Sequence, residues 1–124
     1  MTEYDPHEAL DAQEWNVLDE DERMFLVEQY HKRKRIRLPN HRLHAIIHVT
    51  VENQVSMGDE LNVAETLDRL MSEGLDRHEA IHAIASILTE HLHGVMGGKT
   101  RDFTHSRYFE RLQDLTAAEW KEMG

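Results

Sequence analysis

The sequence of 124 residues contains no cysteine. This absence excludes a disulfide framework, a thiolate nucleophile and every cysteine-ligated zinc or iron–sulfur site. If the protein binds a metal ion, its ligands must therefore be histidine, aspartate or glutamate. Proline and glycine are also scarce, with 2 and 6 residues respectively, which favours long uninterrupted helices over a turn-rich β fold.

Long apolar runs and positive charge are scarce as well. No segment approaches the roughly 20 apolar residues that a membrane span needs, and the opening stretch MTEYDPHEAL lacks the apolar core of a signal peptide. The formal net charge is −10 with histidine neutral, which disfavours nucleic acid because phosphate binding depends on positive charge. We therefore expect a cytoplasmic protein that binds neither a membrane nor a nucleic acid.

Length and composition predict one globular domain, since 40% of the residues are apolar and 31% are charged. Caps and apolar stripes predict short N-terminal helices over 6–18, core helices over 20–35, 41–57, 63–73 and 77–93, a loop over 94–105 and C-terminal helices over 106–123. Residues 47–51 alternate as in a strand, but the length of their segment favours a helix. The predicted fold over 1–124 is all-α, a single compact, bundle-like domain of five to seven helices.

Histidine is abundant, with 10 residues, and the histidines of two predicted helices form stripes. At about 100° per residue, the stripes border the apolar faces. They consist of His41, His44, His48 and Glu52 in the helix 41–57, and of His78 and His82 in the helix 77–93. If the two helices pack side by side, these stripes meet at a half-buried seam. Helical bundles build histidine and carboxylate metal sites in this way.

The preferred interpretation is therefore a divalent transition metal bound by His44, His48, His78 and His82, with Glu52 and His41 as further ligands. Nitrogen and oxygen ligands suit Zn²⁺, Ni²⁺, Fe²⁺ and Mn²⁺ without ranking them. The alternative is a non-enzymatic interaction or dimerisation module, because a histidine ring is also stable at a core boundary without a metal. Such a module would bind a second copy or another protein, and its histidines would make it pH-responsive.

A third interpretation comes from residues 78–82, HEAIH, which read as H-E-x-x-H. On a helix this motif can hold zinc and supply a general base, which would be Glu79 in a zinc-dependent hydrolase. The residues after His82 lack the histidine and glycine spacing of a metzincin. Glu79 can instead close a capping box that begins at Asp76. The sequence thus leaves enzymatic activity open and favours a non-enzymatic protein.

A nucleotide site is not expected. The stretch GVMGGKT, residues 94–100, imitates a phosphate-binding loop, but the required first glycine would fall on His93. It also follows a predicted helix, whereas such loops follow a strand.

Two stretches together resemble a known group of proteins. His41 to Gln54 read H-x-x-H-x-x-x-H-x-x-x-E-x-Q, and RHEAIHAI follows at 77–84. This combination resembles a group of small bacterial α-helical domains of unknown function. EWNVLDEDERMFLVEQYH, residues 14–31, resembles their lead-in, so the resemblance covers residues 10–92. It implies a small helical protein of bacterial origin and no particular activity.

Overall fold

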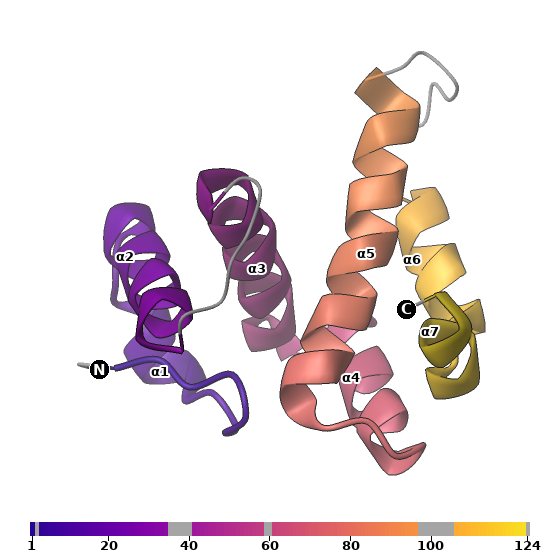
Figure 1. Cartoon of the computed structure of the whole chain (residues 1–124), viewed down its shortest axis with the longest axis horizontal. Helices are drawn as coiled ribbons and strands as arrows, with labels where there is room; N and C mark the ends of the chain where they lie inside the picture. Colours follow the sequence, from indigo (N-terminus) through magenta and orange to yellow (C-terminus); the bar gives the residue numbers. More distant parts are fainter. Residues whose placement is uncertain (2, 35–40, 59–60, 97–105, 124) are drawn as a thin grey trace.

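Seven α-helices make up the part of the chain that the computed structural model describes, residues 1, 3–34, 41–58, 61–96 and 106–123 (Figure 1). They are α1 (Ala12–Asn16), α2 (Glu20–Arg33), α3 (His41–Ser56), α4 (Val63–Ser72), α5 (Arg77–Met96), α6 (Ser106–Asp114) and α7 (Ala117–Met123). Within these residues there is no β-strand, which confirms the all-α prediction. None of the described helices combines the length and the apolar character needed to cross a lipid bilayer.

Local capping explains where the helices that carry the site begin and end. The side chain of Asp19 accepts a hydrogen bond of 2.8 Å from the backbone N–H of Glu22, which caps α2. Gly74 has φ +112°, and the Leu75 N–H donates to the Leu70 carbonyl at 3.2 Å, so a Schellman motif closes α4. The chain can therefore reverse sharply and enter α5 within a few residues.

The chain departs from the predicted helix bounds by more than two residues at two places. Residues 5–8 form a turn, in which the Glu8 N–H donates to the Asp5 carbonyl, and helix begins only at Ala12. The Pro6 carbonyl accepts a hydrogen bond of 3.1 Å from Arg77, so a tertiary contact uses the group that a helix would need. α5 continues to Met96, three residues into the predicted loop. Residues 35–40 and 97–105 lie outside the described part of the chain.

Helix α3 lies at the centre of the packing. It contacts α1, α2, α4 and α5, and α5 also packs against α4 and α6. Figure 1 shows α2 and α3 side by side on one side of the molecule and α5 with α6 on the other. Val51 of α3 belongs to a core built mainly from α4, α5 and α6, whereas Ala45 and Val49 belong to a second core with α1 and α2. His44 and His48 of α3 consequently lie where the two cores meet.

Replacing Ile84 by alanine should destabilise the protein strongly. Ile84 is fully buried in the core around α5, and removing so many carbon atoms from a packed core costs about 2–5 kcal/mol. The matched control is Val17→Ala, because Val17 is 82% exposed and its truncation should change stability by less than about 0.5 kcal/mol. Urea denaturation of both variants measures the difference, and equal losses would contradict this packing.

Candidate metal centre

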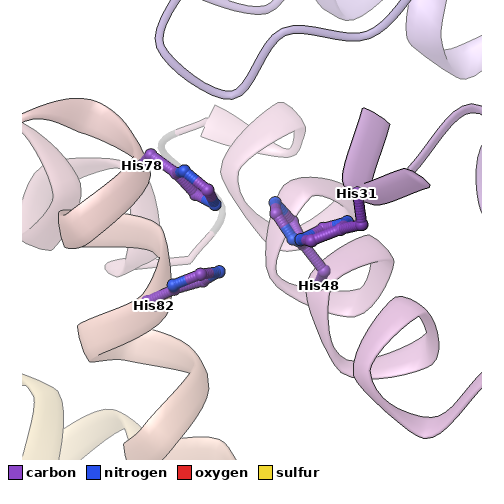
Figure 2. A group of neighbouring side chains, drawn as sticks. All are labelled: His31, His48, His78 and His82. Atoms are coloured by element: carbon purple, nitrogen blue, oxygen red, sulfur yellow. The ribbon is translucent and has the colours of Figure 1, made fainter. Parts of the chain in front are cut away.

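Four imidazoles from three helices converge at the seam between the two cores. His31 comes from α2, His48 from α3, and His78 and His82 from α5. One ligand nitrogen of each lies within 4.8 Å of those of the other three. Figure 2 shows His78 and His82 reaching from one helix toward His48 and His31 on the opposite side. A tetrahedral zinc ion with bonds of about 2.0–2.1 Å places its ligand nitrogens about 3.3 Å apart. The rings therefore need only small movements to share one ion.

The cluster is enclosed by protein. His31 and His48 are 2% and 1% exposed, and His78 and His82 are half-buried. The ring centroids of His78 and His82 lie 4.2 Å apart, and that of His48 lies 5.8 Å from His78 and 5.6 Å from His82. The rings thus pack on one another between the surrounding helices.

Three nitrogens of this cluster are buried and have no hydrogen-bond partner in the described part of the chain. They are Nδ1 of His48, Nε2 of His78 and Nε2 of His82. Buried polar atoms are nearly always paired, and each unpaired one costs about 1–3 kcal/mol. Three such atoms, all contributed by one group of four rings, make this cluster a candidate metal site.

The hydrogen bonds at the far side of two rings fix which nitrogen carries the proton. Nδ1 of His31 lies 2.8 Å from the Val27 carbonyl, which can only accept, so the His31 lone pair is on Nε2. The Tyr4 hydroxyl donates to the Glu52 carboxylate, so its oxygen accepts the N–H of His48 Nε2 at 2.7 Å. The lone pair of His48 is therefore on Nδ1, the nitrogen that no described residue contacts by a hydrogen bond.

His44 lies at the edge of the cluster, outside the group of four. Its Nε2 is 3.1 Å from Nε2 of His31, and since the His31 nitrogen has a lone pair, His44 donates the hydrogen. The His44 ring centroid is 4.6 Å from that of His31 and 5.2 Å from that of His82. In this state His44 occupies the lone pair that His31 would offer to a metal ion.

Glu52 reaches the cluster only through other side chains. Arg77 binds the two carboxylate oxygens of Glu52 in a bidentate ion pair, with N–O distances of 2.8 Å. The side chain of Glu52 is 0% exposed and that of Arg77 is 4% exposed. Burial by itself lowers the pKa of Arg77, but the hydrogen bonds and charge of Glu52 more than offset this and raise it. The hydroxyl of Tyr4 also donates a hydrogen bond to the Glu52 carboxylate. The Glu52 carboxylate is thus linked to Nε2 of His48 through the hydroxyl of Tyr4.

Burial favours the neutral form of His48, His78 and His82. Desolvation, followed by the repulsion of neighbouring histidines, lowers the pKa of His78 and of His82 to about 4. The same causes lower the pKa of His48 well below its usual value of 6.5. At pH 7 these rings are uncharged and have lone pairs, which is the form that metal ions bind.

Of the predicted site residues, the structure brings together His48, His78 and His82 and places His44 beside them. Glu79 is exposed, and its backbone N–H donates to the Asp76 carboxylate at 2.8 Å, as a helix cap requires. Its role as a base stays a prediction. The side chain of His41 lies outside the described part of the chain.

Sequence reasoning missed His31. It stands in the basic stretch HKRKR, which is favoured at a helix end by the helix dipole. The signal was present, however, because Met24, Val27 and His31 follow the i, i+3, i+7 spacing of a buried helix face. All three are buried in the structure.

No model of a known protein family matches the chain, and no curated protein or solved structure matches it either. The resemblance to small bacterial helical domains therefore stays a prediction. Any function assigned to the protein depends on the geometry of the histidine cluster.

The metal-free protein should lose stability as the pH falls from 6.5 to about 4. His78 and His82 have a pKa of about 4 when folded and of 6.5 without the fold, so between these values the unfolded chain binds more protons. Above pH 6.5 the two residues should contribute no pH dependence. Urea denaturation in the presence of a chelator, from pH 7.5 to 4.5, measures the effect. The double variant His78→Gln/His82→Gln should show a shallower dependence, and an unchanged slope would contradict the assignment.

Removing Arg77 should be far more costly than removing an exposed arginine. Arg77→Met leaves the carboxylate of Glu52 buried without its counterion, which typically costs about 3–5 kcal/mol. Arg42→Met breaks the ion pair of 3.7 Å with Glu28 at a position where the arginine is 65% exposed, and should cost less than about 1 kcal/mol. Denaturation of the two variants at pH 7 compares them. A similar small loss in both would show that the buried pair does not support the fold.

Proposed function

We propose that the protein binds one divalent transition-metal ion through His31, His48, His78 and His82. One observation supports this most directly: three buried imidazole nitrogens lack a partner among the described residues, inside a group of four whose ligand atoms lie within 4.8 Å. Their neutral state at pH 7 supports it further, because binding then needs no displacement of protons from His78 or His82.

The ligand set favours some metals over others. Four imidazoles suit Zn²⁺, Ni²⁺, Fe²⁺ and Cu²⁺, whereas Mn²⁺ prefers oxygen ligands. Of the ions that the sequence leaves open, manganese is therefore the least suited. Glu52, the nearest carboxylate in the network, already has its two oxygens bound by Arg77 and Tyr4.

The same set favours a binding or structural role over hydrolysis. A tetrahedral ion held by four protein ligands has no position for a reacting water, whereas catalytic zinc keeps one open. The exposure of Glu79 also gives the hydrolase interpretation no support. An ion in this place would link α2, α3 and α5, so that its binding energy would stabilise the fold.

Wild-type protein purified without a nickel column should bind about one equivalent of Zn²⁺ or Ni²⁺ and melt at a higher temperature when loaded. Free metal at 100 times the dissociation constant stabilises a protein by about 2.7 kcal/mol. The variant His78→Ala/His82→Ala should lose both effects because it removes two of the four ligands. Elemental analysis and thermal melting with added metal or chelator measure them.

The matched control is His93→Ala, which removes an exposed histidine from the same helix, α5. It should bind metal and melt like the wild type. If wild-type protein takes up no stoichiometric metal and its melting ignores both metal and chelator, the proposal is wrong. The histidines are then boundary residues, as the interaction-module interpretation holds.

A further inference from the structure

The segment of residues 3–8 lies against the histidine cluster, although it contains no regular helix. The Tyr4 carbonyl accepts a hydrogen bond of 3.2 Å from Arg33 of α2, and the Pro6 carbonyl accepts one of 3.1 Å from Arg77 of α5. The ring of His7 lies 5.1 Å from that of His78. Helices from both sides of the seam therefore hold this segment across it.

Tyr4 is the residue of this segment that enters the site network. It is 1% exposed, and its hydroxyl stands between Nε2 of His48 and the Glu52 carboxylate. Arg77 fixes that carboxylate from the other side. A chain of hydrogen bonds thus runs from Arg77 through Glu52 and Tyr4 to His48.

This chain has the arrangement that orients and strengthens a histidine ligand. A histidine that binds metal through one nitrogen commonly donates its other N–H to a fixed acceptor, and that acceptor sets the orientation of the ring. When a cation takes the lone pair on Nδ1 of His48, its Nε2–H becomes a stronger donor toward Tyr4. The buried carboxylate at the end of the chain stabilises the positive charge that the ring then shares.

We propose that Tyr4, held by Glu52 and Arg77, is a positioning residue for His48, and that residues 3–8 dock more firmly over the site when the metal is bound. The proposal rests on the proposed function. Because coupling between two binding events is reciprocal, metal strengthens docking by the same factor as docking strengthens metal binding. How firmly residues 3–8 are docked then depends on whether the site holds a metal ion.

The ring and the hydroxyl of Tyr4 have separable roles. The ring packs against Trp15, Tyr30 and His48, with centroid distances of 5.8, 6.2 and 5.4 Å. This packing belongs to the second core and serves the fold. The hydroxyl, in contrast, makes the hydrogen bonds to Glu52 and His48. Tyr4→Phe therefore removes these hydrogen bonds and keeps the packing of the ring.

Tyr4→Phe should weaken Zn²⁺ binding by about 10- to 100-fold, the usual effect of losing a group that orients a metal ligand. Competition with a chromophoric zinc chelator measures the affinity. The control is Tyr108→Phe, which removes a hydroxyl from another buried tyrosine, one that donates to Gln54 and not to the His48–Glu52 pair. Its affinity should equal that of the wild type, and circular dichroism should show both variants folded.

Hydrogen exchange provides a second readout, which the wild-type protein alone can supply. Amides in residues 3–8 should exchange more slowly with Zn²⁺ than with chelator, and Tyr4→Phe should lose most of this difference. Exchange that ignores zinc in a wild type that binds it, or an unchanged affinity in folded Tyr4→Phe, overturns the coupling and leaves the metal site standing. A wild type that binds no zinc overturns both proposals.

Discussion

The ion pair between Arg77 and Glu52 constrains the rest of the structure. Two charges withdrawn from water cost several kcal/mol each unless they are paired with good geometry, and here both oxygens of the carboxylate are bound. This requirement favours the register of α3 against α5 in which the two side chains meet. His48 stands one turn before Glu52, and His78 directly follows Arg77, so the register that pairs the charges also brings the imidazoles together.

The histidine cluster itself opposes folding unless something is bound in it. Its rings are desolvated, and three of their nitrogens are buried without hydrogen bonds to any described residue. The apolar cores on both sides must supply the stability that offsets this cost. A cation bound by those nitrogens would offset the free-energy cost of leaving them without hydrogen bonds. Rings already held close by the surrounding helices lose little further freedom on binding, which favours affinity.

Much of the fold could be predicted from the sequence, because caps and apolar periodicity are local properties. Gly74 closes α4 at the end of the predicted helix 63–73, and the stripes that contain His48, His78 and His82 do meet. Pairings between distant residues could not be predicted. Periodicity does not reveal that Glu52 pairs with Arg77, 25 residues away, and that Arg77 and Tyr4 bind its carboxylate oxygens. Arg77 also donates a hydrogen bond to the Pro6 carbonyl, although the position of Pro6 after Asp5 locally favours a helix start.

The choice between His31 and His44 shows where periodicity stops being informative. His31 is on the buried face of α2 and His44 is at the border of the buried face of α3, so the contact between these helices brings the two rings together. The hydrogen bond to Val27 leaves His31 with a lone pair on Nε2, and His44 donates to that atom. An ion bound as proposed must take this lone pair, so His44 must turn away or exchange its own proton. Under this proposal five imidazoles would compete for four ligand positions, and displacing His44 would set part of the cost of binding the ion.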